Sequence, residues 1–180
     1  MVLDACVLYP APIRDLLLHL AAEDLYSPKW SQRIHDEWIR NLSANRPDLD
    51  KSNLNRTQQL MDESFPEASV RNFSGLEKTL SLPDPDDNHV LAVAIKSRSK
   101  KIITFNLKDF PSNKLTQHHV KAVHPDLFIV NLIQSDEERA KRAFLNQVAN
   151  LKNPPLTQTQ VLNVLNERLP STVTSLEKLF

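Results

Sequence analysis

The sequence predicts an α/β fold with a central, mainly parallel sheet, followed by a part made only of helices. Short apolar or β-branched runs at residues 1–3, 101–105 and 119–123 predict strands, and helical spacing of apolar residues fills much of the chain between them. Strands that alternate with helices favour a parallel sheet flanked by helices. From residue 125 onward only helical patterns remain. We therefore expect one domain over residues 1–124 and an all-helical extension over residues 125–180.

The first elements are predicted from apolar spacing and from residues typical of helix ends. An apolar run stops at Asp4, as expected of a buried strand that delivers a carboxylate at its C-terminal end. Pro12 suits the first turn of a helix, and Leu25-Tyr26 could form a brief strand. Ser31 is expected to cap the next helix, and a further helix is expected around residues 54–65. This order gives strand, helix, short strand and a pair of helices.

The second half of the predicted domain contains its clearest strand. Residues 70–82 show no readable pattern, but the Pro-Asp turn at 83–86 leads into a helix with apolar residues between 90 and 95. The run 101–105 is short, β-branched and bounded by polar residues, and 119–123 alternates as a last strand. We expect these two runs to pair in the sheet.

The C-terminal helices are predicted from their caps. Ser135 and Glu138 form a predicted capping box before a helix that reaches about residue 151. Thr157 and Gln160 form another after a Pro-Pro break, and a last turn-like element is expected over 171–180.

Composition excludes several classes of protein. The chain of 180 residues has one glycine, Gly75, where average usage predicts about 13; glycine-rich phosphate loops are therefore excluded. The 22 basic and 22 acidic residues balance, which does not indicate a non-specific nucleic-acid coat. One cysteine, Cys6, excludes an internal disulfide. With no long apolar run and no signal-peptide pattern, we expect a cytoplasmic protein without a membrane partner.

Four acidic residues occur where a parallel sheet would gather them. Asp4 and Asp109 follow predicted strands, Glu37 lies in the second helix, and Asp87 lies in the first turn of the helix after the Pro-Asp turn. Ligands of such sheets bind outside the carboxyl ends of the strands. Each residue alone could act at a helix end or in a turn. Together they would repel one another without a cation, and oxygen donors favour Mg²⁺ or Mn²⁺, ions that serve phosphoryl chemistry.

The segments around these carboxylates resemble a known family. The chain resembles the PIN-domain nucleases, in particular the VapC-type toxins of bacterial toxin–antitoxin pairs, over about its first 125 residues. The helical tail is similar to an extension carried by one branch of these toxins. The matching segments, in order, are VLDACVLY, WSQRIHDEWIRNL, LPDPDDNHVLAVAI and IITFNLKDF.

The resemblance implies a PIN-like three-layer fold and a role for particular residues. The residues that take the family's acidic positions, which are catalytic and bind one or two Mg²⁺ or Mn²⁺ ions, are Asp4, Glu37, Asp87 and Asp109. Thr104 and Asn106 would support the site, and Asn106 stands where many relatives have a further aspartate. The family usually has asparagine two residues after the first aspartate, whereas this chain has Cys6, a weak hydrogen-bonding group.

The resemblance also implies an activity and partners. It implies an endoribonuclease that cleaves RNA phosphodiesters by an activated water, leaving a 5′-phosphate and a 3′-hydroxyl. Glu37 would hold a second ion or orient that water. The implied partners are an RNA substrate and a cognate antitoxin, whose C-terminal segment would lie between the early helices, with the toxin as a homodimer or in a toxin–antitoxin hetero-oligomer.

Basic residues near the four carboxylates could bind the RNA backbone. The best candidates for a basic rim are Arg14, Arg40 and Arg46. His89, two residues after Asp87, is expected to be structural.

Two alternatives stay open. One is a PIN-like module that binds RNA or protein without catalysis, which the departure at Cys6 allows. The other is a HAD-type phosphatase, which also uses an aspartate after its first strand and Mg²⁺. That class needs a second aspartate two residues later, where Cys6 stands. The sequence does not distinguish transfer, ribosomal and messenger RNA as the substrate.

Overall fold

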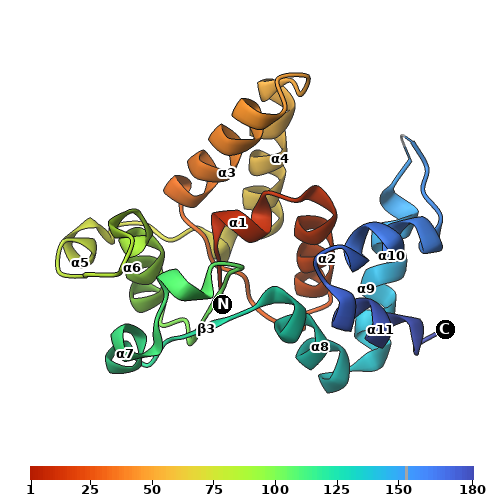
Figure 1. Ribbon diagram of the computed structural model, residues 1–180. Coiled ribbons are helices and arrows are strands. Elements are labelled where there is room, and N and C mark those ends of the chain that lie inside the picture. Colours follow the sequence, from red (N-terminus) through yellow and green to blue (C-terminus); the bar gives the residue numbers. More distant parts are fainter. Residues whose placement is uncertain (153) are drawn as a thin grey trace. The chain divides into compact units, whose positions relative to one another are not determined.

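The computed structural model describes residues 1–152 and 154–180 (Figure 1). Its strands are β1 (Val2–Leu3), β2 (Lys101–Ile103) and β3 (Lys121–Val123). Its α-helices are α1 (Ala5–Leu8), α2 (Ala11–Ala22), α3 (Gln32–Asn45), α4 (Lys51–Ser64), α5 (Ser74–Glu77), α6 (Asn88–Lys96), α7 (Ser112–Leu115), α8 (Pro125–Ser135), α9 (Glu137–Asn150), α10 (Gln158–Asn166) and α11 (Pro170–Glu177). Short 3₁₀ helices are η1 (Pro66–Ala68), η2 (Pro85–Asp87), η3 (Leu107–Asp109) and η4 (Thr116–His118).

The three strands form one parallel sheet in the order β1-β2-β3, which confirms the predicted fold class. Ile102 lies opposite Val2 on one side and Ala122 on the other. The last strand begins later than predicted, because His119 has a left-handed backbone conformation, with φ 57°, that ends η4. All three strands run the same way, so their carboxyl ends meet at one edge.

The predicted strand at Leu25-Tyr26 is wrong. Extended pairing occurs four residues later, where Lys29 bridges Val2 and the following residue bridges Ser69. The reason is local: Tyr26 is buried and its hydroxyl donates to the carbonyl of Leu17, so this segment packs back on α2 instead of pairing in the sheet.

Contacts between residues divide the chain into two compact units. The first contains residues 1–9 and 28–123, and the second contains residues 10–27 and 124–180. The second unit therefore holds α2 in addition to the helices after residue 124.

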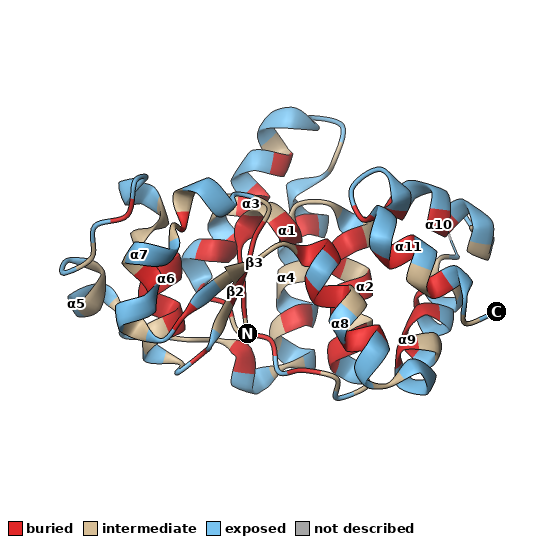
Figure 2. Cartoon of the chain, turned by 60° about the horizontal axis from the view of Figure 1, so that its bottom comes forward, coloured by how far each residue is buried: buried red, intermediate tan, exposed pale blue. Residues whose placement is uncertain are grey.

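In the first unit, helices pack around the short sheet. Helix α6 contacts β1 and β2, α1 contacts α3, and α3 and α4 pack side by side as a pair (Figure 1). Ser31 caps α3 as predicted, since its hydroxyl accepts the backbone N–H of Ile34 at 3.3 Å. Trp30 and Trp38 are fully buried. Helix α6 is buried all round at residues 89–94, whereas α3 buries one face and exposes the other (Figure 2).

In the second unit, α2 packs on α9, and α8 packs on α9 and α11. The capping box at Thr157 is confirmed. The one predicted at Ser135 is wrong: Asp136 caps α9 by accepting the N–H of Arg139, because the Ser135 hydroxyl is occupied in donating to the carbonyl of Leu132. The turn-like element predicted near the end is the helix α11.

None of the helices formed by residues 1–152 and 154–180 has the length and apolar character needed to cross a membrane.

A carboxylate on α8 caps α11 from a distance. Asp126 is buried and accepts the backbone N–H groups of Ser171 at 3.1 Å and Thr172 at 2.7 Å. Burial opposes its ionisation, but the hydrogen bonds from Thr172 and Ser171 outweigh that effect and lower the pKa of Asp126. The carboxylate thus fills the place of an N-cap that no residue next to α11 supplies within the described chain.

We predict that Asp126→Ala lowers the free energy of unfolding by about 1–3 kcal/mol at pH 7, because the buried N–H of Thr172 and the part-buried N–H of Ser171 lose their acceptor. Because the pKa of Asp126 is lowered in the folded protein, this stabilisation is present above the unfolded pKa and is lost as the pH falls through the folded value. Urea denaturation at pH 7 and pH 3 measures both effects. The exposed Glu138→Ala variant is the control, and an equal loss at both pH values would contradict the prediction.

Candidate acidic site

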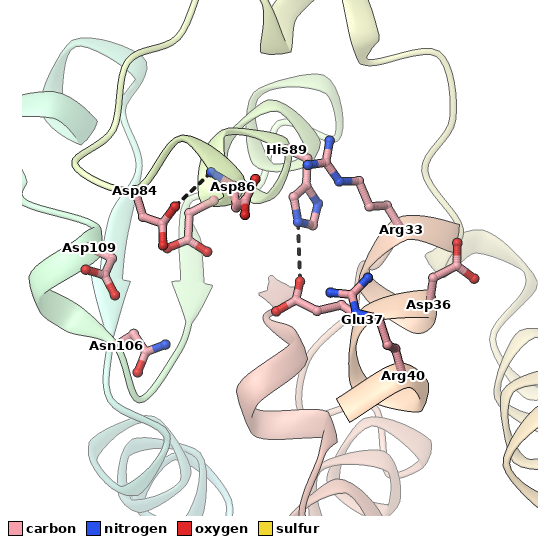
Figure 3. A pocket seen from close by; sticks show the side chains of 10 residues that line it. Arg33, Asp36, Glu37, Arg40, Asp84, Asp86, His89, Asn106 and Asp109 are labelled. Atoms are coloured by element: carbon pink, nitrogen blue, oxygen red, sulfur yellow. Dashed lines mark hydrogen bonds and ion pairs between the residues drawn. The ribbon is translucent and has the colours of Figure 1, made fainter. Parts of the chain in front are cut away.

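A polar pocket of about 420 Å³ lies in the first unit (Figure 3). Six carboxylates and two guanidinium groups face it. Its lining residues are Arg33, Asp36, Glu37, Arg40, Asp84, Asp86, Asp87, His89, Asn106 and Asp109. Such a concentration of oxygen ligands is suited to a hard divalent cation.

One wall of the pocket is the exposed side of α3. Arg33, Glu37 and Arg40 lie three or four residues apart, so they share one face of the helix (Figure 3). The opposite face of α3 buries Ile34 and Trp38 in the core. The burial of these apolar residues therefore fixes which side of the helix is turned to the pocket.

The facing wall comes from η2, the start of α6 and η3. Asp84 accepts the N–H of Asp86 at 2.9 Å and so begins η2. Asp87 ends that turn, and Asp109 ends η3. In Figure 3, Asp84 and Asp109 lie across the pocket from Glu37. The two walls bring together carboxylates that are far apart in the sequence.

His89 connects the two walls. It is 1% exposed, and its Nε2 lies 3.5 Å from Oε2 of Glu37 (Figure 3). Its Nδ1 is buried and has no hydrogen-bond partner among the residues the structure describes. A buried ring fixed in this position restricts where the Glu37 carboxylate can go. His89 thus supports the site, beyond the structural role expected of it.

Asp4 does not line the pocket and is almost fully buried, at 2% exposure. Its Oδ1 accepts the N–H of Ala5 at 2.7 Å, and its Oδ2 accepts the hydroxyl of Thr104 at 2.7 Å and the thiol of Cys6 at 3.1 Å. Burial raises the pKa of Asp4; the hydrogen bonds from Thr104 and Cys6 oppose this shift, and the charge of Glu37 adds to it. The carboxylate is therefore held in place by hydrogen-bond donors and lies close enough to feel the pocket's charge.

Cys6 takes part in this hydrogen-bond network. Its sulfur lies 3.3 Å from the Thr104 hydroxyl and accepts the N–H of Phe105 at 3.2 Å, in addition to its contact with Asp4. Burial and the negative charge of Asp4 raise the pKa of the thiol, which keeps it protonated. A protonated thiol can donate to Asp4, as the asparagine usual in the family could. The departure at this position therefore replaces one donor by a weaker one.

Asp87 experiences the repulsion between the carboxylates most strongly. Its pKa is raised to about 7 by burial and by the negative charges of Asp4, Asp84, Asp109 and Glu37. No hydrogen bond to its side chain occurs within the described chain that could offset these charges. A positive ion among the carboxylates would remove this repulsion.

The structure brings most of the predicted site residues together. Glu37, Asp87, Asp109, Asn106 and Arg40 line the pocket. Asp4 and Thr104 do not line the pocket and are joined to each other by a hydrogen bond.

Two of the predicted basic residues lie elsewhere. Arg14 is buried in the second compact unit and does not line the pocket. Arg46 also lies outside the pocket lining and pairs with Asp48 through two hydrogen bonds. Helical spacing in the sequence could not show that Arg14 is buried, because this burial depends on tertiary packing.

Sequence reasoning did not identify several residues that line the pocket. Arg33 lies one helical turn before Glu37, and Asp84 lies one turn before Asp87. Spacing of three or four residues from a predicted ligand is the signal that could have indicated them. Asp36 and Asp86 also line the pocket and are neighbours of predicted ligands.

The donor set fits Mg²⁺ or Mn²⁺ by its chemistry. Carboxylate oxygens dominate the pocket, and the repulsion that raises the pKa of Asp87 is the effect a divalent cation would relieve. Within residues 1–152 and 154–180, however, no group of three or more His, Cys, Asp or Glu side chains is arranged to hold a metal ion.

The parallel sheet and the pocket of carboxylates define the first unit as an α/β domain with an acidic site. Comparison with known proteins gives the family of this domain. Residues 1–108 match the PIN domain family, and residues 125–178 match the VapC50 C-terminal domain. The chain therefore belongs to the PIN domain family.

A curated relative from Mycobacterium tuberculosis is named "Putative ribonuclease VapC50". It is 37% identical over 94 residues, which span 52% of this chain and 56% of the relative. The alignment thus spans little more than half the length of that relative. No solved structure matches the chain.

We predict that Asp87→Asn stabilises the metal-free protein at pH 8 by roughly 2–4 °C in melting temperature, which is about 1 kcal/mol for a chain of this size. Because the folded pKa of Asp87 is raised to about 7, wild-type stability falls as the pH rises from the unfolded value of 3.8 through 7. The uncharged variant escapes this loss, so its advantage should disappear near pH 4.

Thermal unfolding in EDTA at pH 8 and pH 4 measures this difference. Asp86→Asn, the exposed neighbour in the same pocket, is the matched control and should change the melting temperature little. An Asp87→Asn variant that is less stable than wild type at pH 8 would show that the carboxylate contributes net favourable contacts.

Proposed function

We propose that this chain is a metal-dependent endoribonuclease and the toxin of a type II toxin–antitoxin pair. The observation that carries the proposal is the pocket in which Glu37, Asp87 and Asp109 meet beside the buried Asp4. The membership of the PIN domain family and the printed name of the mycobacterial relative support it.

Four carboxylates would hold one or two Mg²⁺ or Mn²⁺ ions, namely those of Asp4, Glu37, Asp87 and Asp109. Bound there, the ion would supply a water activated for in-line attack on a phosphodiester and would stabilise the leaving oxyanion. Ligand carboxylates must be deprotonated, so ion binding would displace the proton that the raised pKa of Asp87 retains.

The remaining side chains hold these ligands in position. The Thr104 hydroxyl accepts the N–H of Asn106 at 2.9 Å while it donates to Asp4, so it fixes the turn after β2 and the first carboxylate together. His89 holds Glu37 on the opposite wall. Glu37 is then placed to orient a water or to bind a second ion.

Two guanidinium groups could orient the RNA backbone. Arg40 lines the pocket, and within the described chain it has no ion pair. Arg33 lines the pocket too and is held by an ion pair with Glu77. Guanidinium groups bind phosphate oxygens in a fixed geometry, which suits them to positioning the scissile group.

We assign the nuclease chemistry to residues 1–124 and treat 125–180 as a helical extension, in line with the two family matches. A toxin of this kind would act on RNA in the cytoplasm, pair with an antitoxin and form a homodimer or a toxin–antitoxin hetero-oligomer.

One observation favours a second candidate, a PIN-like module that binds RNA without cleaving it. No three acidic, histidine or cysteine side chains of the described residues are arranged to hold a metal ion. The phosphatase alternative has no such support, because a half-buried Cys6 with a raised pKa stands where that class needs a carboxylic acid.

We predict that the wild-type protein cleaves single-stranded RNA in Mn²⁺ or Mg²⁺ and that Asp109→Asn lowers the rate on the order of a hundredfold or more, because an ion ligand is lost. The matched control is Glu63→Gln, an exposed carboxylate on α4 outside the pocket. Gel separation of end-labelled RNA gives the rates. RNA binding without cleavage in either ion would favour the non-catalytic module, and equal rates for Asp109→Asn and wild type would contradict the assigned site.

A further inference from the structure

A second cavity, of about 570 Å³, adjoins the acidic pocket within the same compact unit. Its lining residues are Gln32, Arg33, Asp36, Asp62, Pro66, Ser69, Val70, Arg71 and Phe73. Arg33 and Asp36 line both cavities, so the two spaces meet along the N-terminal half of α3. A volume of this size is typical of small-molecule and cofactor sites.

Backbone pairing and an ion pair hold the walls of this cavity. Trp30 donates its N–H to Ala68 and accepts the N–H of Val70, which fixes the segment before Arg71. The Arg33–Glu77 ion pair joins α3 to α5 just beyond Phe73. The backbone hydrogen bonds of Trp30 and the Arg33–Glu77 ion pair thus fix two of the segments that bound the cavity.

A turn directs two side chains of different chemistry toward this space. Asn72 has a left-handed backbone, with φ 60°, a conformation that asparagine adopts more readily than most residues. Arg71 and Phe73 flank that turn and both line the cavity. Arg71 is exposed and forms no ion pair with any described residue, whereas Phe73 is half-buried. The cavity therefore offers both a guanidinium group and an aromatic ring.

We propose that this cavity binds the nucleotide that adjoins the scissile phosphate, with its base stacked on Phe73 and its phosphate bound by Arg71. This inference rests on the proposed ribonuclease function. An aromatic ring beside a free cation is the combination that binds single-stranded nucleic acid, because every base has a face to stack and every nucleotide a charge to neutralise. Because Arg33 lines both cavities, one bound RNA strand would run from the acidic pocket into this cavity.

The carboxylates of the cavity give it a preference among bases. Asp62 accepts the indole N–H of Trp30 at 2.8 Å, and Asp36 accepts the amide of Gln32 at 2.8 Å, so both are held in place. An ionised carboxylate accepts hydrogen bonds and cannot donate them. A base with an exocyclic amino group can donate to it, as cytosine N4 does to acidic side chains. Uracil has no exocyclic amino group and can donate only its ring N3–H, so adenine, cytosine and guanine are favoured over uracil at this position.

The test compares wild type and variants in the cleavage of an RNA with a randomised segment in Mn²⁺. The cut ends are mapped to give the base preference. KM and kcat are then measured on one of the cut sequences. Phe73→Leu removes the ring, and Phe73→Tyr keeps it. Arg71→Gln removes the charge at an exposed position. The matched control is Arg56→Gln, an exposed arginine on α4 outside both cavities.

We expect wild type to disfavour uracil at one position next to the cut. Phe73→Leu should raise KM roughly five- to a hundredfold with a much smaller change in kcat, and should weaken the base preference, because stacking is lost. Phe73→Tyr should retain both properties, and Arg71→Gln should raise KM. Wild-type cleavage combined with variants that match Arg56→Gln in KM and base preference would overturn this subsite and leave the proposed function standing. Absence of cleavage by wild type would overturn both.

Discussion

The first unit and its site both depend on the hydrogen bonds of the buried residue Asp4. Its backbone N–H donates to Ile103 at the end of β2, its Oδ1 caps α1, and its Oδ2 accepts the Thr104 hydroxyl. One residue thus joins β1, α1 and the turn after β2. Burying a charged group is costly without such partners, and three donors supply them. The same bonds that stabilise the sheet edge also fix the carboxylate beside the pocket.

The carboxylate of Asp87 in the pocket, unlike that of Asp4, is not compensated by hydrogen-bond donors within the described chain. Asp87, Asp109 and Glu37 face one another without enough positive charge between them, and the raised pKa of Asp87 expresses that conflict. Perturbed carboxylates in a cleft are typical of functional sites, where local stability is exchanged for chemistry. Arg33 and Arg40 lie on the same helix face as Glu37, but neither forms an ion pair with these carboxylates within the described chain. A divalent cation would complete the arrangement.

The sequence predicted the elements that have strong local signals. The strands that the structure has at 2–3 and 101–103 were predicted, the second as far as residue 105, and so was the cap at Ser31, because short apolar runs and capping residues act locally. The strand expected at Leu25-Tyr26 failed because packing on α2 outweighed β propensity. Glu37, Asp87 and Asp109 could be assembled from strand ends and family resemblance, but the burial of Arg14 and the second cavity could not. Those features depend on tertiary contacts between segments distant in sequence.

The most direct measurement is the melting temperature of the wild-type protein, starting metal-free at pH 7.5, during titration with MnCl₂ and, separately, with KCl at matched ionic strength. An ion that binds only the folded site stabilises it by about RT ln(1 + [L]/Kd), so the melting temperature should rise continuously with Mn²⁺ above its Kd, by several degrees. Potassium should have little effect, since screening reduces only exposed repulsion. The same curve for both salts would contradict a divalent-cation site among these carboxylates.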